Sequence, residues 1–274
     1  MTIHTTHCAL RLGDNLAHLH FLRKLAAAYP DHGFTHFCHG DYLDQLREVV
    51  SDIPRIRLTA FAEAYFVSRW EMRPPDALGS TNAWKNSSGF FDRHPQKETY
   101  SAVMLDWYHE LARRLGLESP LHTREDLLFD YPALNAKKIK FQSDPFDILI
   151  VNSPPLSGQA PRFYSEQMDS LIGRLAQSYR IVTTFRRPGL DLPCTMDLNA
   201  TVTGIGRLSQ VCNAIVMVST GPSWPTFNIW NRDSIKLRVV INEPEIVDLD
   251  PKAVHVPDVA GAAEAIHART GVSL

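Results

Sequence analysis

The sequence predicts an α/β protein built from two Rossmann-like domains that face each other across a cleft. Short apolar segments typical of strands alternate with amphipathic segments typical of helices, which favours parallel sheets with helical crossovers. This alternation stops at a polar, lysine-rich segment, residues 135–143, and then restarts. A length of 274 residues suits two compact domains. We therefore expect an N-terminal domain over residues 1–140 and a C-terminal domain over residues 141–274.

The N-terminal half contains three predicted strands and three predicted helices. The strands are expected at residues 8–12, 34–38 and 55–60, and the helices at residues 15–29, 42–50 and 98–115. Pro30 ends the first helix, because proline lacks the backbone N–H that a continuing helix needs. Residues 70–95 show no steady period, and their aromatic side chains favour a functional loop over a disordered one.

The C-terminal half repeats the alternation of strands and helices. Strands are expected at residues 146–151, 179–184, 214–219 and 236–241, and the last of them closes the sheet. Helices are expected at residues 165–178 and 207–213, with a further helix through residues 227–230. Two such series are typical of two nucleotide-binding domains.

Composition and charge exclude several classes of protein. With 44% hydrophobic residues the chain is not disordered, and 28 basic against 30 acidic residues give no electrostatic reason to expect nucleic acid as a partner. The longest apolar runs are far shorter than the roughly 20 residues that cross a bilayer. Residues 1–7 lack the basic start and apolar stretch of a secretory signal, so a cytoplasmic location is expected.

Cysteine and histidine spacing does not predict a metal site. The four cysteines lie far apart without a CxxC pair and are expected to be buried free thiols. They are Cys8, Cys38, Cys194 and Cys212. Seven histidines precede residue 40, but their spacing does not match a metal-binding motif. Residues 248–250 (DLD) lie just before a proline and are expected to form a turn.

Asp14 lies in the turn that follows the first predicted strand. Open parallel sheets bind ligands at the carboxyl ends of their strands, so the Asp14 carboxylate is expected to point into the cleft. There it can take the proton of an attacking hydroxyl group as a general base. The alternative is that Asp14 only caps the helix that begins at Asn15, and spacing alone does not decide between the two.

Two turns of the C-terminal half lie at the same kind of edge. Residues 219–223 (STGPS) separate a strand from a helix, so backbone amides and the positive helix end would face a bound diphosphate. The alternative there is a plain capped helix start. Residues 152–159 follow another strand, and Arg162, Arg186 and Arg187 are placed to pair with phosphate. Each arginine alone is more often a solvated surface residue, but together they favour an anion site.

Four blocks of the sequence, in their order, resemble the bacterial heptosyltransferase family of glycosyltransferases. They are residues 9–15 (ALRLGDN), residues 21–30 with the segments FLRKL and YP, residues 203–208 (TGIGRL) and residues 219–224 (STGPSW). The resemblance implies a GT-B fold with two Rossmann-like domains. It also implies inverting transfer of a sugar from a nucleoside diphosphate sugar, with neither a metal nor a cofactor.

The resemblance assigns roles to individual residues. It implies that Asp14 is the general base and that the acceptor is the hydroxyl of a glycan, a glycolipid or a protein. The expected donor-binding residues are Ser157, Gly158, Arg162, Thr183, Thr184, Arg186, Ser219, Thr220, Gly221 and Ser223. The expected acceptor-binding residues are Arg11, Asn15, Trp84 and Lys85.

Two other functions remain open from the sequence. One is a nucleotide-sugar epimerase on the same fold. The other is a noncatalytic protein that binds nucleotide sugars or glycans. The late motif makes this second alternative plausible, because it begins with Ser219 where the family usually has an aspartate and reaches Trp224 near the usual position of a histidine.

Overall fold

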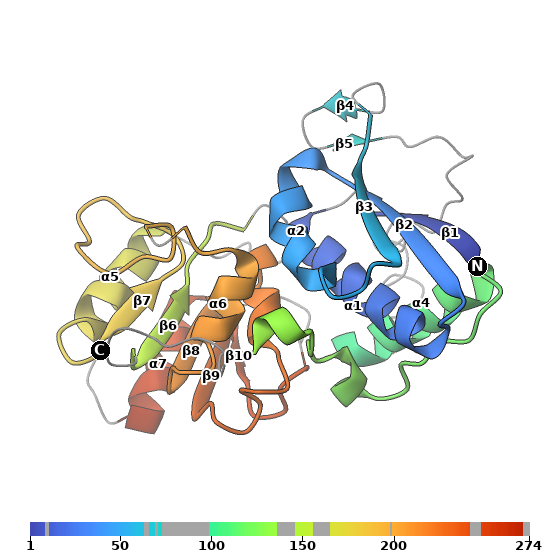
Figure 1. Ribbon diagram of the computed structural model, residues 1–274. Helices are drawn as coiled ribbons and strands as arrows, with labels where there is room; N and C mark the ends of the chain where they lie inside the picture. Colours follow the sequence, from blue (N-terminus) through green and yellow to red (C-terminus); the bar gives the residue numbers. More distant parts are fainter. Residues whose placement is uncertain are drawn as a thin grey trace. The chain divides into compact units, whose positions relative to one another are not determined.

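The computed structural model describes residues 1–8, 11–62, 66–68, 71–72, 99–135, 146–155, 165–197, 199–241 and 248–270. The chain divides into two compact units, Met1–Ala133 and Leu134–Leu274. Each unit has a parallel sheet with helices between its strands, so the predicted α/β class is confirmed (Figure 1).

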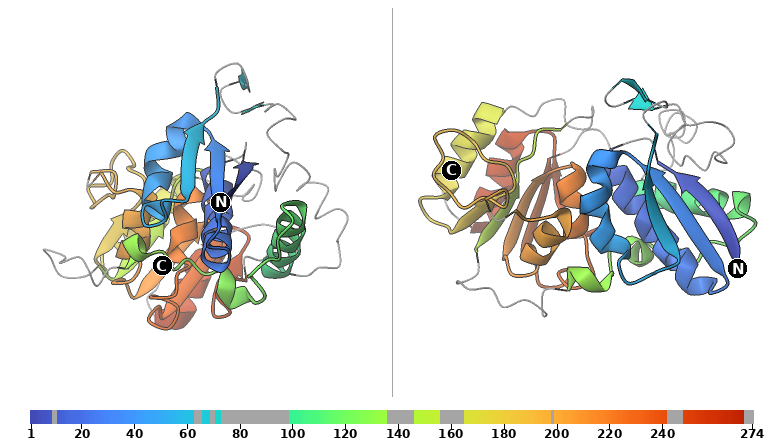
Figure 2. Two further views of the ribbon diagram at one scale, coloured as in Figure 1. Left: turned by 45° about the vertical axis from the view of Figure 1, so that its right-hand side comes forward. Right: turned by 45° about the horizontal axis from the view of Figure 1, so that its top comes forward.

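The first unit contains a parallel sheet of three strands. They are β1 (Thr2–His7), β2 (His32–Cys38) and β3 (Ile56–Ala60), in that spatial order. The crossovers are α1 (Leu12–Ala28), and α2 (Leu43–Val50) with the preceding 3₁₀ helix η1 (Gly40–Tyr42). The two crossover helices contact each other, so they lie on the same side of the sheet (Figure 2).

Helix α1 is the centre of this unit's core. Its apolar residues Leu16, Leu19, Leu22 and Leu25 are fully buried. The ring of Phe21 stacks on that of Tyr108 in α4 (Tyr100–Arg114), with ring centroids 4.6 Å apart. A helix that is buried around most of its surface is held in place by its neighbours on every side. The first turn of α1 therefore belongs to a rigid element.

Shorter elements complete the first unit. A separate antiparallel pair consists of β4 (Phe66–Ser68) and β5 (Glu71–Met72). The 3₁₀ helices η4 (Arg124–Leu127) and η5 (Pro132–Leu134) follow α4 in the chain. Apart from Glu71 and Met72, the predicted loop at residues 70–95 lies outside the described residues, as does nearly all of the predicted linker at residues 135–143.

The second unit contains a parallel sheet of five strands. They are β6 (Ile148–Val151), β7 (Ile181–Thr183), β8 (Ala214–Val218), β9 (Leu237–Ile241) and β10 (Val254–Val256). Their spatial order is β10-β9-β8-β6-β7. The chain moves from β6 to β7 on one side and then crosses to β8 on the other side of β6. The β6/β8 boundary is therefore a topological switch point, where sheets of this type bind ligands.

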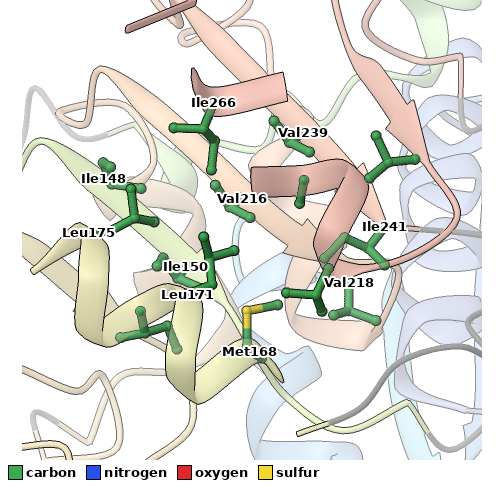
Figure 3. Packing of buried hydrophobic residues seen from close by; sticks show 14 of the residues in the cluster. Ile148, Ile150, Met168, Leu171, Leu175, Val216, Val218, Val239, Ile241 and Ile266 are labelled. Carbon is green, nitrogen blue, oxygen red and sulfur yellow. The ribbon is translucent and has the colours of Figure 1, made fainter. Parts of the chain in front are cut away.

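Helices cover both faces of this sheet. Helices α5 (Ser165–Leu175) and α7 (Val259–Thr270) pack on one face, as Figure 3 shows. The buried side chains at that interface include Ile148, Ile150, Met168, Leu171, Leu175, Val216, Val218, Val239, Ile241 and Ile266. The 3₁₀ helix η7 (Gly221–Thr226) contacts α6 (Val202–Leu208), and Arg238 of β9 donates hydrogen bonds to Thr226 of η7.

Most predicted elements of the chain are confirmed. The predicted segments at residues 34–38, 42–50, 55–60, 98–115, 146–151, 165–178, 179–184, 214–219 and 236–241 overlap observed elements of the same type. All four cysteines are buried free thiols, also as predicted. Within the described residues, no helix is long and apolar enough to cross a membrane.

The prediction for the first strand is wrong. The strand is β1, Thr2–His7, whereas residues 8–12 were expected, and α1 begins at Leu12 instead of Asn15. The β1 segment (TIHTTH) consists mainly of threonine and histidine, so it lacks the apolar alternation that marks a strand. Its residues pair in parallel register with β2, from Thr2 opposite His32 to His7 opposite Phe37.

Three predictions near the end of the chain also need correction. Helix α6 spans Val202–Leu208, ahead of the expected residues 207–213, and in place of a helix through residues 227–230 the chain forms η7. The sheet does not close at β9, because β10 pairs beyond it. Gly206 obscured α6, since glycine disfavours helices. A Cβ atom at Gly206 would lie 2.7 Å from the Pro225 carbonyl oxygen, so α6 needs glycine there to approach η7.

Candidate functional site

Asp14 lies in the first turn of α1. Arg11 is the N-cap residue, with an extended backbone (φ −78°, ψ 172°). Asp14 lies three residues later, and its Oδ2 atom accepts a hydrogen bond from the Arg11 backbone N–H at 3.1 Å. A carboxylate at this position satisfies a backbone donor that the helix leaves unpaired. Asp14 therefore does have a capping role, although it is not the N-cap residue itself.

The surroundings of Asp14 raise its pKa to about 6. Burial is the largest cause, because it disfavours the charged form. The backbone N–H groups of Arg11 and of Asp14 itself, and the Arg11 guanidinium, act in the opposite direction. Asp14 nevertheless remains partly exposed. At pH 7 the carboxylate is mostly ionised and basic enough to take a proton, which suits a general base.

Two tyrosines from other elements lie close to this carboxylate. Tyr42, at the end of η1, makes a side-chain hydrogen bond with Arg11, and Tyr108 is fully buried in α4. The pKa of each phenol is raised, first by burial and also by Asp14 and Cys8. Both hydroxyls are therefore neutral at physiological pH. No local sequence pattern pointed to either residue, because η1 and α4 are distant from Asp14 in the chain.

Asn15 faces the interior of the unit. Its side chain is completely buried, and its Nδ2 donates to the Arg11 carbonyl oxygen at 3.0 Å. Its Oδ1 accepts from Nε2 of His36 at 3.1 Å. These bonds favour a structural role for Asn15 over the acceptor-binding role predicted for it. Arg11 is partly exposed and stays a candidate for acceptor binding.

In the second unit, the loops that follow β6 and β7 are hydrogen-bonded to each other. The Asn152 side chain donates to the Phe185 carbonyl and accepts from the Phe185 N–H, both at 2.9 Å. The hydroxyls of Ser153 and Thr184 lie 3.3 Å apart. These contacts hold the carboxyl end of β6, which borders the switch point, to the carboxyl end of β7. Of the predicted donor-binding residues, Thr184 belongs to this cluster.

The β8–η7 turn carries four more predicted donor-binding residues. Ser219 follows β8 directly, and Thr220 and Gly221 are partly exposed. The Ser223 hydroxyl accepts from the Thr220 N–H at 3.2 Å and donates to the Thr220 carbonyl at 2.7 Å. Ser223 is buried, so its observed role is to close this turn. The following helix is a six-residue 3₁₀ helix, which offers a smaller dipole than the expected α-helix.

A buried ion pair anchors the other end of η7. The Nε of Arg238 donates to Asp250 at 2.9 Å, and its terminal nitrogens donate to the hydroxyl and the carbonyl of Thr226, both at 3.0 Å. The guanidinium also lies 4.4 Å from the ring centre of Phe227. Burial lowers the pKa of Arg238, and Asp250 counteracts that effect. The sequence pattern did not single out Arg238.

Asp250 belongs to a turn, as predicted for residues 248–250. Its second oxygen accepts from the Lys252 N–H at 2.9 Å, so both oxygens have protein donors. Among the described residues, no group of three or more His, Cys, Asp and Glu side chains is arranged to hold a metal ion.

The remaining predicted site residues, for the donor and for the acceptor, divide into those that the structure describes and those that it does not. Arg186 forms an exposed ion pair with Asp197, and the neighbouring Arg187 pairs with Asp169 at 3.0 Å. Thr183 is buried, and its hydroxyl donates to the Pro193 carbonyl at 3.4 Å. Five further predicted site residues lie outside the described residues: Ser157, Gly158, Arg162, Trp84 and Lys85.

Comparison with known proteins identifies the fold. No family model and no curated protein sequence matches the chain. The solved structure of "E. coli heptosyltransferase WaaC with ADP" is similar, with 15% sequence identity, a TM-score of 0.54 and coverage of 98% of this chain and 100% of that chain. WaaC "with ADP-2-deoxy-2-fluoro heptose" gives 15% identity, a TM-score of 0.52 and 93% coverage of both chains. The resemblance that the motifs indicated is thus confirmed in the architecture: the chain has the two-domain, GT-B-type fold of the heptosyltransferase WaaC.

Proposed function

We propose that the protein is a glycosyltransferase that moves a sugar from a nucleoside diphosphate sugar to an acceptor hydroxyl. The acceptor is a glycan, a glycolipid or a protein. The observation that carries the proposal is the Asp14 carboxyl group, which follows the first strand of the first unit and has its pKa raised to about 6. A base with a pKa near the working pH is efficient at removing a hydroxyl proton.

The reaction is proposed to be a single inverting displacement. The acceptor oxygen forms a bond to the anomeric carbon while the bond from that carbon to the diphosphate oxygen breaks. The acceptor proton moves to the Asp14 carboxylate, and the nucleoside diphosphate leaves with the electron pair of the broken bond. The Arg11 N–H bond to Asp14 orients the carboxylate and favours its ionised form.

The donor is proposed to bind at the β6/β8 switch point of the second unit. The strand ends there carry Asn152 and Ser153 after β6, Thr184 after β7, and Thr220 and Gly221 after β8. Ligands of doubly wound sheets bind outside such strand ends. The WaaC structures of the same fold contain ADP and an ADP-sugar, which supports a nucleoside diphosphate sugar as the donor.

The negative charge of the donor diphosphate is proposed to be neutralised by protein groups, without a metal ion. Arg186 is exposed in its pair with Asp197, and exposed ion pairs contribute only about 0–1 kcal/mol. A diphosphate can therefore compete for this guanidinium, and arginine binds phosphate oxygens in a bidentate manner. The same proposal places the protein in the cytoplasm, where free thiols such as its four buried cysteines stay reduced.

A donor screen tests this proposal. Thermal unfolding is measured with a panel of nucleoside diphosphates and their sugars, since a ligand at 100 times its Kd adds about 2.7 kcal/mol of stability. Each sugar that stabilises the protein is then assayed for hydrolysis and for transfer. Turnover by the parent protein and its loss in Asp14→Asn are the expected results. Tight binding without turnover of any sugar would instead indicate a noncatalytic nucleotide-sugar-binding protein.

A further inference from the structure

A chain of three hydrogen bonds runs through the interior of the first unit and ends at the turn that carries Asp14. The Thr6 hydroxyl lies 2.9 Å from Nδ1 of His36, and Nε2 of His36 lies 3.1 Å from Oδ1 of Asn15. Nδ2 of Asn15 lies 3.0 Å from the Arg11 carbonyl oxygen. The side chains of Thr6, His36 and Asn15 are all completely buried. The chain therefore connects β1, β2 and α1 without contact with solvent.

The strand register brings the first two members together. Thr6 of β1 and His36 of β2 are direct partners in the parallel sheet, so their side chains lie on the same face. Asn15 reaches them from the first turns of α1. The backbone N–H of Asn15 also donates to the Arg11 carbonyl, at 3.2 Å. That carbonyl is thus held by two donors from one residue.

The chemistry of these groups fixes the direction of every hydrogen bond. The Arg11 carbonyl only accepts, so the Asn15 amide nitrogen must face it and Oδ1 must face His36. Oδ1 also only accepts, so the proton of His36 is on Nε2. In a neutral imidazole Nδ1 is then an acceptor, and the Thr6 hydroxyl donates to it. The chain therefore selects the Nε2–H tautomer of His36.

The groups packed around His36 favour its neutral form. The ring of His18 stacks on that of His36, with centroids 4.8 Å apart, and His7 lies close enough to interact with both. Burial, followed by His18 and His7, holds the pKa of His36 well below its usual value. His18 itself is buried with its pKa lowered to about 3. At neutral pH His36 and His18 are therefore uncharged, and stacking restricts the rotation of the His36 ring.

Arg11 is consequently held from both sides. Asp14 accepts from its backbone N–H, and Asn15 donates to its carbonyl oxygen. We propose that His36 is a positioning residue for Asp14, acting through Asn15 and the backbone of Arg11 to fix the orientation of the carboxylate. This inference rests on the proposed role of Asp14 as the base. His36 itself touches no reacting atom in this scheme.

The test compares two substitutions of His36. His36→Phe keeps a planar ring but removes the donor to Asn15, whereas His36→Gln retains an amide N–H near the position of Nε2. In His36→Phe we expect kcat to fall about tenfold to a hundredfold, because small displacements of a reacting group have effects of this size, while the KM for the donor stays near the parental value. We expect His36→Gln to retain most of the activity.

A pH profile distinguishes positioning from a purely structural role. The hydrogen bond from the Arg11 N–H lowers the pKa of Asp14. If the Arg11 backbone becomes more mobile and this bond weakens, the pKa of Asp14 should rise. On the acid side of the pH profile, the fall in kcat should therefore occur at higher pH in His36→Phe than in the parent. Val49→Ala is the matched control, since Val49 is also fully buried in this unit but lies on α2 and outside the hydrogen-bonded chain. The control should lower the melting temperature without changing the pH at which kcat falls.

Two NMR measurements test the positioning role of His36 without an enzymatic assay. Nitrogen-15 spectra of His36 should show the Nε2–H tautomer from pH 6 to pH 8, and carbon-13 titration of Asp14 should show a higher pKa in His36→Phe than in the parent. If the parent turns over no donor, the proposed function fails, while the Asp14 titration still decides the positioning role. An Nδ1–H tautomer, or a folded His36→Phe protein with parental Asp14 titration, would overturn it.

A second variant covers the possibility that His36→Phe does not fold. Thr6→Val preserves a β-branched side chain but removes the hydroxyl that donates to Nδ1 of His36. The Nε2–H tautomer should persist, because Oδ1 of Asn15 still requires a donor, but the His36 ring loses one of its two hydrogen bonds, so the Asp14 pKa should rise by a smaller amount than expected for His36→Phe. If the Asp14 titration stays parental in a folded Thr6→Val protein, the hydrogen-bonded chain does not position Asp14.

Discussion

Asp14 and Arg11 are joined by a hydrogen bond from the Arg11 backbone N–H to the Asp14 carboxylate, 3.1 Å long, across the first turn of α1. The bond satisfies a donor that the helix leaves unpaired, and it also stabilises the ionised carboxylate. Burial opposes it and raises the pKa of Asp14 to about 6. The capping role and the proposed catalytic role thus belong to one carboxyl group, and they can be separated by experiment.

Asp14→Asn should abolish sugar transfer and leave donor affinity nearly unchanged. Asparagine keeps an oxygen that accepts from the Arg11 N–H, but it cannot take a proton from the acceptor. We expect kcat to fall by about 10²- to 10⁴-fold, the usual contribution of a general base. Asp44→Asn on α2 is the control, because the Asp44 side chain is 90% exposed. A parental rate in Asp14→Asn would show that Asp14 is only a capping residue.

The same pair of proteins should differ in the pH dependence of stability. The pKa of Asp14 is raised in the folded state from about 3.8 to about 6, so the folded protein binds this proton more tightly than the unfolded chain. The contribution is fully present below pH 3.8 and is lost as the pH rises through 6. Asp14→Asn should therefore gain stability relative to the parent between pH 4.5 and pH 7.5, by at most about 3 kcal/mol.

Urea unfolding of both proteins at these two pH values measures that gain. All other titrating groups are shared, so their effects cancel in the difference between the proteins. A difference in unfolding free energy that does not change with pH would mean that the Asp14 pKa is ordinary. The proposed base would then be a weaker one than the fold suggests.

The second unit could be predicted from the sequence more completely than the first. Strand β6 is buried along its whole length and β8 is buried except at its first residue, and both appear as continuous apolar runs. In β1 the pattern failed, because Thr6 and His7 are polar yet buried. A buried histidine such as His36 is satisfied by partners from other elements, and a local pattern does not show them.

The local structure around Asp14 was predicted only in part. Asp14 lies in the first turn of α1, whereas it was predicted in the turn before the helix, because the bounds of both β1 and α1 were misplaced. The neighbouring Tyr42 and Tyr108 come from η1 and α4, so only tertiary packing brings them to Asp14. The same holds for Arg238 and Asp250, whose pairing depends on how the chain returns after β9.

Gly221→Glu should abolish donor binding while leaving the fold intact. The β8–η7 turn is partly exposed at Gly221, and a glutamate there would fill the space next to the proposed diphosphate and repel it. Gly173→Glu on α5 is a matched control, because a Cβ at Gly173 meets no atom within 4 Å and the helix lies on a face of the sheet. Parental nucleotide affinity in the Gly221 variant, measured by calorimetry, would remove this turn from the donor site.

Chelation should leave transfer unchanged. Backbone amides, hydroxyls and arginine neutralise the diphosphate charge in the proposed site. Asp250 of the DLD turn is not available to a metal ion, because its two oxygens accept hydrogen bonds from Arg238 and from the Lys252 N–H. Activity is measured after dialysis against EDTA and again after addition of Mg²⁺ or Mn²⁺. Loss of activity that one of these ions restores would contradict the metal-independent mechanism.

Breaking the Arg238–Asp250 pair should weaken both the fold and the donor site. Arg238→Met leaves a buried carboxylate without its partner, and removal of one member of a buried pair typically costs about 3–5 kcal/mol. It also frees Thr226 at the end of η7, so the β8–η7 turn should lose order and donor affinity should fall in the fraction that remains folded. Arg180→Met is the matched control, because the Arg180–Asp147 pair lies at the surface, with its side chains 54% and 29% exposed, and should contribute only about 0–1 kcal/mol. Urea unfolding and calorimetric titration of the nucleotide measure the two effects separately. A stable Arg238→Met protein with parental nucleotide affinity would show that this ion pair supports neither the sheet nor the turn.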